Sequence, residues 1–294
     1  MTAPFGHVLT AMITPFDADG NVDHGKVWEL ASFLVENGSG GIVVGGTTGE
    51  SPTLSFDEKT ALFRAVVDAV GDKAVVVAGT GTYDTRESIE LTEQAAAAGC
   101  HGAMAVTPYY SRPSQEGLIA HFSAIAAASD LPVLLYNIPS RTGRRIEVET
   151  LVALSENPGI VAVKDAVGDL SFTTATKVAA GDGLAIYSGD DVLTLPTMAV
   201  GGVGVVSVAA HLAGRQVAEM VAAALSGDWE RARTLHLALA PLCKALFAEP
   251  NPQPVKAGLT AFWEPVGDPR LPLVPAAAAT VAAVGEALEM ARRA

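Results

Sequence analysis

The chain has 294 residues, of which 49% are hydrophobic and 17% are charged, so it can bury a large core and is too apolar for a disordered chain. Its net charge of -13 leaves no basic footprint, and we expect neither a nucleic-acid partner nor binding to an anionic membrane. No Lys or Arg precedes Lys26, no apolar run reaches about 18 residues, and Cys100 and Cys243 lack paired spacing, so we expect a cytoplasmic protein without signal peptide or membrane span.

Short runs rich in β-branched residues alternate along the chain with stretches of Ala, Leu and Glu at helical spacing. Gly, Pro or Asn ends each helical stretch, as is usual at helix termini. The runs predict strands at 7–14, 41–44, 74–78, 102–107, 132–137, 160–164, 184–188 and 204–208, and helices at 56–70, 85–98, 115–129, 147–155, 170–180, 191–200 and 211–225.

The alternation predicts an α/β fold, because eight successive strand–helix units close a (β/α)8 TIM barrel. We expect this catalytic barrel to span residues 1–226. Residues 227–294 lack a β-rich run and show helical patterns at 228–247, 254–263 and 275–293. Proline-rich connectors at 249–254 and 267–272 cannot lie inside helices. The tail is therefore predicted to be a C-terminal all-helical domain.

Polar segments that follow the strands are candidates for chemistry, because the active site of such a barrel forms at the C-terminal ends of its strands. Residues 45–50, Gly-Gly-Thr-Thr-Gly-Glu, follow the second strand. Their glycines allow a close backbone approach, and the hydroxyls of Thr47 and Thr48 with neighbouring N–H groups suit a carboxylate or a phosphate. The alternative is a glycine-rich turn in which Thr48 only caps the next segment.

Two neighbouring strands end in a phenol and an amine. Tyr136 closes the fifth strand and Lys164 closes the apolar sixth strand, so the two side chains are expected to meet at the barrel mouth. An amine removed from water attacks a carbonyl readily and forms a Schiff base. The alternatives are a tyrosine packed in the core and a lysine paired with Asp165, Asp169 or Asp190.

Other polar residues give weaker indications. Arg141 follows Tyr136 and has the fork geometry that binds a carboxylate. Tyr109 and Tyr110 lie on a loop between two prolines and suit either the site or a subunit interface. The six histidines show no ligand spacing, so we expect no metal.

Together these segments resemble the dihydrodipicolinate synthase family of pyruvate-dependent class I lyases and aldolases. The resemblance runs from about residue 5 to residue 293. It is carried by 45–50, by 136–143 (Tyr-Asn-Ile-Pro-Ser-Arg-Thr-Gly), by 163–165 (Val-Lys-Asp) and by 188–191 (Ser-Gly-Asp-Asp), while 107–118 and 249–256 match as well.

The resemblance implies roles for individual residues. Lys164 would form the Schiff base with pyruvate, and Tyr136 would be the general acid and base. Thr48 would link Tyr136 to Tyr110, which enters from a neighbouring subunit in this family. The pyruvate site would be completed by Thr47, Thr48, Gly189 and Val206, and Arg141 would bind the carboxylate of aspartate semialdehyde.

The activity implied is the condensation of pyruvate with aspartate semialdehyde in lysine and diaminopimelate biosynthesis. No cofactor is implied, because the imine between Lys164 and pyruvate is itself the electron sink, and the family's usual assembly is a homotetramer built as a dimer of dimers. The alternative is a sister lyase that acts on a sugar-derived or other keto acid. A keto-acid sensor without activity would lack the Lys or the Tyr, and a structural protein needs no polar cluster at one rim.

Some members of this family are inhibited by L-lysine in the dimer cleft. Glu87 and Tyr109 match that site, whereas Phe56, Lys59 and Tyr83 depart from the residues usual in sensitive members, and Ser51 completes the set of matching positions. We therefore expect weak or absent inhibition, because a cation, a bulky ring and an apolar ring replace polar contacts to the ligand.

Overall fold

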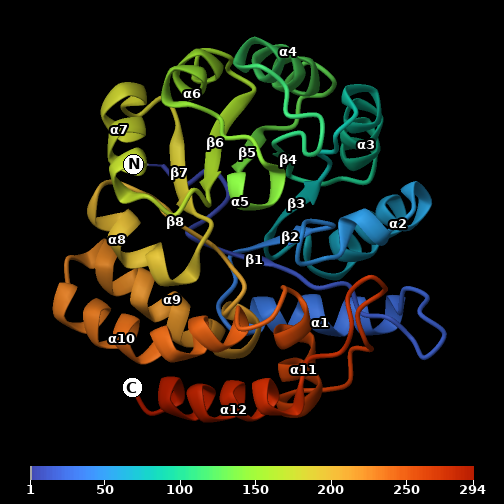
Figure 1. The fold of residues 1–294 in the computed structure, drawn as a ribbon, viewed down its shortest axis with the longest axis vertical. Coiled ribbons are helices and arrows are strands. Elements are labelled where there is room, and N and C mark those ends of the chain that lie inside the picture. The colour runs from blue at the N-terminus through green and yellow to red at the C-terminus, as the bar shows by residue number, and fades with distance from the viewer. Residues whose placement is uncertain (1) are drawn as a thin grey trace.

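Eight parallel strands close a barrel in the computed structural model, which describes residues 2–294 (Figure 1). Each strand pairs with the next in sequence, and β1 pairs with β8 to complete the circle. The expected fold class is confirmed. The strands are β1 (Val8–Ala11), β2 (Gly41–Val44), β3 (Val75–Gly79), β4 (Gly102–Val106), β5 (Val133–Asn137), β6 (Ile160–Asp165), β7 (Ala185–Ser188) and β8 (Gly204–Ser207).

Helices follow the strands and surround the barrel (Figure 1). Two of them, α2 and α7, have the bounds that the periodicity predicts, and the other predicted helices differ by a few residues at their ends, where helices fray. The barrel helices are α1 (His24–Glu36), α2 (Phe56–Val70), α3 (Thr85–Ala97), α4 (Gln115–Ala126), α6 (Val148–Ser155), α7 (Leu170–Ala180), α8 (Thr194–Ala199) and α9 (Ala210–Ser226).

The structure corrects three details of the expected elements. Strand β1 is shorter than predicted, because beyond Ala11 the chain leaves the sheet and Thr14 donates from Oγ1 to the carbonyl of Gly49 over 2.7 Å. The predicted helix 191–200 is a 3-10 turn followed by α8, since the Asp191 carboxylate accepts hydrogen bonds from backbone N–H groups at the start of α9. Helix α1 was not predicted, although its buried residues Val27, Leu30, Ala31 and Leu34 have helical spacing.

Side chains of alternate strand residues fill the inside of the barrel. Leu134 and Tyr136 of β5 belong to this inner apolar cluster, as do Ala162 of β6, Tyr187 of β7 and Val206 of β8. Because strand side chains alternate, Lys164 points inward two residues after Ala162. The inner cluster therefore forms the floor beneath the polar groups at the C-terminal ends of the strands.

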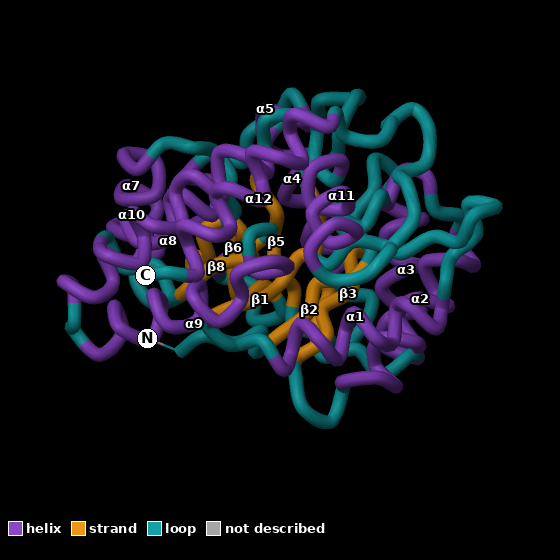
Figure 2. The backbone as a smooth tube through the Cα atoms, turned by 90° about the horizontal axis from the view of Figure 1, so that it is seen from below, coloured by secondary structure: helices purple, strands orange, loops and turns teal. Residues whose placement is uncertain are grey.

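Three further helices, α10 (Trp229–Leu246), α11 (Gln253–Phe262) and α12 (Ala278–Arg292), lie beside α9 and α1 (Figures 1 and 2). Leu235, Leu239 and Leu242 of α10 share one apolar cluster with Val217 and Met220 of α9. The division into domains 1–226 and 227–294 stays a prediction. Between residues 2 and 294, the structure has no helix long and apolar enough to cross a membrane.

Candidate active site

The register of β5 and β6 brings the phenol and the amine together. Tyr136 lies opposite Lys164 in the parallel ladder, as their positions at strand ends predict. The Lys164 Nζ lies 4.1 Å from the centroid of the Tyr136 ring, and both side chains are 4% exposed. A Cβ built on Gly189 would lie 2.7 Å from the Ala166 Cβ and 3.1 Å from the Lys164 Cγ, so a residue without a side chain fits best beside the Lys164 side chain.

The carboxylates that were alternatives for pairing with Lys164 are held elsewhere. Asp165 accepts hydrogen bonds from the Val167 N–H at 3.0 Å and from the Thr173 hydroxyl at 2.6 Å. Asp169 and Asp190 each cap the first turn of the helical segment that follows them. Burial raises the pKa of the Asp165 carboxyl. None of these three carboxylates forms an ion pair with Lys164 in the part of the chain that the structure describes.

The loop after β2 has the backbone that its glycines predict. Gly45 has a φ of 69°, in the left-handed region, and a Cβ on Gly79 of β3 would lie 2.4 Å from the Gly45 carbonyl oxygen. Thr47 lines the cavity above the loop. Thr48 is 3% exposed and its Oγ1 accepts a hydrogen bond from Asn251 at 2.8 Å. The next turn, Ser51–Thr53, has no side-chain cap, so Thr48 does not serve as one.

The segment after β5 is fixed by its own polar side chains. Asn137 bonds the backbone of Ile146 twice, with its amide donating to the carbonyl and its oxygen accepting from the N–H, each at 3.0 Å. Pro139–Thr142 forms the short helix α5, which was not predicted, and Thr142 donates to the carbonyls of Ile138 and Arg144. This arrangement presents the exposed Arg141 at the rim.

Two adjoining cavities meet at Ile138 and Arg141, which line both. The first, of about 200 Å³, is also lined by Thr47 and Tyr136. The second is also lined by Gly189. Val206 lies in the inner cluster below, so its side chain forms part of the floor.

Tyr110 lies apart from these groups within one chain. Its side chain is 95% exposed and its φ of 67° is unusual for a residue with a side chain. The loop that carries it is tied to the Arg141 segment, because Arg112 donates from Nε to the Gly143 carbonyl at 2.9 Å. An exposed phenol held in this way is available to another subunit.

Two of the positions that match a lysine site line the first cavity, and a third contacts one of them. Ser51 and Tyr109 line it, and the rings of Tyr83 and Tyr109 meet edge to face with centroids 5.3 Å apart. Burial lowers the pKa of the Lys59 amine, and the nearby Glu87 carboxylate opposes that shift. Burial has the opposite effect on an acid and raises the pKa of the Tyr109 hydroxyl. Phe56 begins α2 and packs against the apolar core, as expected of a ring.

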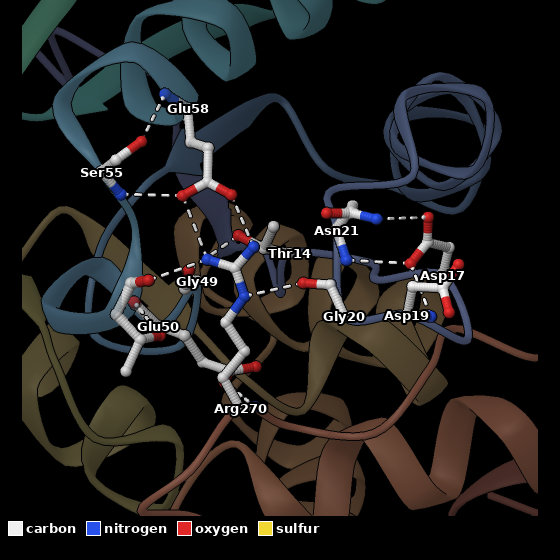
Figure 3. Close-up of polar contacts among 11 residues, drawn as sticks. Thr14, Asp17, Asp19, Gly20, Asn21, Gly49, Glu50, Ser55, Glu58 and Arg270 are labelled. Atoms are coloured by element: carbon white, nitrogen blue, oxygen red, sulfur yellow. Dashed lines mark hydrogen bonds and ion pairs between the residues drawn. The ribbon is translucent and has the colours of Figure 1, made fainter.

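The C-terminal segment, residues 227–294, contacts the site through residues to which the sequence analysis assigned no role. Lys256 of α11 donates to the Glu50 carboxylate at 2.9 Å, and both side chains are buried. The Arg270 N–H donates to the other Glu50 oxygen at 2.8 Å, and the Arg270 guanidinium bonds Glu58 and the Gly20 carbonyl (Figure 3). Glu50 and Lys256 were visible as charged residues in largely uncharged segments, but nothing in the sequence paired them.

The arrangement supplies the groups needed for carbonyl chemistry on an anionic substrate. The Lys164 amine is a nucleophile, the Tyr136 phenol can give and take a proton, and the loop at 45–50 and Arg141 offer sites for carboxylates. Within residues 2–294, no three His, Cys, Asp or Glu side chains are grouped to hold a metal ion.

Comparisons with known proteins agree with this chemistry. The model of the dihydrodipicolinate synthetase family matches residues 4–291. The chain is 56% identical over 270 residues to a 4-hydroxy-tetrahydrodipicolinate synthase of Moorella thermoacetica, covering 92% of each chain. It is also similar to the dihydrodipicolinate synthase of Cyanidioschyzon merolae with lysine bound (TM-score 0.96, 44% identity, 99% of each chain). The chloride-inhibited synthase of Acinetobacter baumannii complexed with pyruvate has a TM-score of 0.95 at 40% identity, over 98% of this chain and 99% of that one.

Proposed function

The chain belongs to the dihydrodipicolinate synthetase family and is a lyase with 4-hydroxy-tetrahydrodipicolinate synthase activity, and on this premise we propose that Lys164 carries the reaction as a Schiff base with pyruvate. The observation that supports this most is the register of β5 and β6, which sets the buried amine against the Tyr136 ring while the nearby carboxylates bond elsewhere.

The reaction begins when the pyruvate carboxylate binds at Thr47 and Thr48 and the Lys164 amine attacks the keto carbon. Loss of water gives an iminium ion, which withdraws electrons and lets the methyl group lose a proton. The resulting enamine carbon attacks the aldehyde carbon of aspartate semialdehyde, forming a carbon–carbon bond and a hydroxyl. The amino group of that substrate then attacks the iminium carbon, closes the ring and releases Lys164.

Tyr136 moves the protons that these steps require. Its ring packs on the Lys164 amine and it lines the first cavity, which supports proton transfer between its hydroxyl and the carbinolamine. Thr48 links Tyr136 to Tyr110 of a neighbouring subunit, and the high exposure of Tyr110 supports this arrangement. The working assembly is a homo-oligomer, a tetramer built as a dimer of dimers.

Arg141 selects the aldehyde by its carboxylate. Its place on the wall shared by both cavities supports this role, because these cavities are also lined by Tyr136 and Gly189, two residues that lie against the Lys164 side chain. A sister lyase for a sugar-derived keto acid would need hydroxyl-binding groups at this position instead of a guanidinium.

Feedback by L-lysine is weak or absent in this chain. A family relative has been solved with lysine bound, but here the buried Lys59, whose pKa the Glu87 carboxylate influences, adds a like charge near a cationic ligand. The alternative is that Lys59 pairs with the carboxylate of the ligand. The Tyr83 ring also takes volume beside Tyr109. The allosteric set Ser51, Phe56, Lys59, Tyr83, Glu87 and Tyr109 is therefore a modified site.

Trapping the imine tests the proposal. Incubation with pyruvate and borohydride, followed by peptide mass analysis, is expected to add a reduced pyruvate adduct to the peptide that contains Lys164. The matched control is Lys256→Arg, which changes another buried lysine and should leave the labelled peptide the same. Labelling at another lysine, or no labelling in folded protein, would refute the role of Lys164.

A further inference from the structure

A side chain of the C-terminal segment holds the catalytic loop, residues 45–50, by a hydrogen bond. Asn251 lies between α10 and α11 and donates from Nδ2 to the Thr48 Oγ1 at 2.8 Å, although the two residues are 203 positions apart. Asn251 is 6% exposed, so little water competes with this bond. The contact joins a part of the chain outside the eight strand–helix units to a threonine of the proposed proton path.

The same segment also holds the loop at Glu50, two residues after Thr48. Lys256 donates to one oxygen of Glu50 at 2.9 Å, and the Arg270 N–H donates to the other at 2.8 Å. Glu50 has a φ of 58°, a backbone conformation that costs free energy for a residue with a side chain. These bonds keep the loop backbone in place independently of Asn251.

The hydrogen bond between the two side chains restricts where the Thr48 proton can point. A threonine hydroxyl has one proton and accepts on its lone pairs, and here Asn251 supplies the proton that Oγ1 accepts. The Thr48 proton is thus free to point toward another acceptor. The Asn251 Oδ1 is buried and has no hydrogen-bond partner among residues 2–294. An unpaired buried acceptor costs free energy, so this amide is poorly explained by stability alone.

We propose that Asn251 is a positioning residue for the reaction, which donates to Thr48 and thereby orients the Thr48 hydroxyl for proton transfer. The inference rests on the proposed function of Thr48 in the proton path. It assigns a part in catalysis to the C-terminal segment, whose Lys256 and Arg270 bond the Glu50 carboxylate and whose helix α10 lines the second cavity.

Two substitutions test the donor. Asn251→Asp keeps the shape but cannot donate when ionised, and Asn251→Ala removes both atoms. Each is expected to lower kcat by about 10-fold to 100-fold, as misoriented catalytic groups do. The KM for pyruvate should change by less than about twofold, because its carboxylate binds the loop that Lys256 and Arg270 still hold. If Asn251→Ala fails to fold, the Asp variant carries the test alone.

A double-mutant cycle separates orientation of Thr48 from a general effect. In a Thr48→Val background there is no hydroxyl to orient, so Asn251→Ala should lower kcat by less than about twofold. Gln253→Ala is the matched control, since Gln253 is a buried amide in the same segment that lines a different cavity. It should keep the kcat of the unmodified enzyme.

The possible results are distinct. The inference is overturned by wild-type kcat in Asn251→Asp, by an undiminished effect of Asn251→Ala in the Thr48→Val background, or by a loss in Gln253→Ala equal to that in Asn251→Ala. If Thr48→Val alone keeps full kcat, the proposed role of Thr48 fails and the inference falls with it. If Thr48→Val lowers kcat while Asn251→Ala keeps the kcat of the unmodified enzyme, the proposed role of Thr48 stands and only the inference about Asn251 fails.

Discussion

Tyr136 and Lys164 form a contact between a ring and an amine at the ends of adjacent strands, and the hydroxyl is the only part of Tyr136 that can transfer a proton. Tyr136→Phe keeps the packing on the amine and removes this group. We expect kcat to fall by about 10²-fold to 10⁴-fold, the usual effect of losing a general acid and base. Steady-state kinetics would check this, with thermal unfolding to verify the fold. An unchanged kcat would exclude proton transfer by Tyr136.

Arg141 differs from its neighbour Arg145 in what its guanidinium contacts. Arg145 pairs with Glu147 and lies over the Phe172 ring, whereas Arg141 lines both cavities. Arg141→Leu is expected to raise the KM for aspartate semialdehyde by at least tenfold and the KM for pyruvate little, because only the aldehyde loses its carboxylate partner. Arg145→Leu is the control and should change neither KM. Equal increases for both substrates in Arg141→Leu would place Arg141 outside the aldehyde site.

At the scale of elements, the start of α2 shows how a local signal and a distant contact combine. Ser55 and Glu58 form the reciprocal cap that begins the helix, a pattern readable in the sequence. Arg270, which no local pattern links to α2, also bonds the Glu58 carboxylate (Figure 3). The helix that follows the catalytic loop is thereby joined to the C-terminal segment.

This contact predicts a pH dependence of stability. The Arg270 guanidinium holds the pKa of Glu58 at about 2, below its ordinary value of 4.5. A lowered folded-state pKa stabilises the ionised form, so the contribution is full above about pH 4.5 and is lost as the pH falls toward 2. Glu58→Gln keeps a capping side chain and removes the charge. Its deficit in unfolding midpoint relative to the unmodified protein should be larger at pH 7 than at pH 3, and equal deficits would contradict the assignment.

At the scale of the whole molecule, the exposed Tyr110 predicts a site shared between subunits. The variants Lys164→Ala and Tyr110→Phe should each have a lower activity than the unmodified enzyme when assayed separately. When the two are unfolded and refolded together, a mixed oligomer contains a site with both intact residues, so activity should exceed that of either variant. Refolding each variant separately before mixing is the control. No gain on co-refolding would show that Tyr110 does not act across subunits.

The changed residues of the lysine set predict the response of the whole enzyme to L-lysine. Loss of about 3 kcal/mol of binding free energy weakens a ligand by about two orders of magnitude. A titration of activity should therefore show little inhibition at submillimolar L-lysine. Lys59→His and Tyr83→Asn together remove the extra cation and the ring, and should increase sensitivity. A dissociation constant of about 1 mM corresponds to a binding free energy of about 4 kcal/mol. Half-inhibition of the unmodified enzyme below about 1 mM would therefore show that the remaining residues suffice to bind L-lysine.

The fold was predictable from the sequence because it depends on periodicity. Eight β-rich runs separated by helical spacing define the barrel, and Lys164 and Tyr136 stood out as polar residues at the ends of apolar strands. Element ends were less predictable, since they depend on contacts such as the bonds of Asp191 to the start of α9. Helix α1 was not predicted, although its buried residues have helical spacing in the sequence.

The sequence by itself determined the order of strands and helices, because this order follows from local repeats of the chain. The register of Tyr136 with Lys164 agrees with their expected positions at neighbouring strand ends, whereas only the tertiary structure decided that Asp165 turns to Thr173. It alone brought Asn251 to Thr48 and Lys256 to Glu50, across 203 and 206 positions. No local pattern specifies such pairs, because they form only where the C-terminal helices pack against the closed barrel.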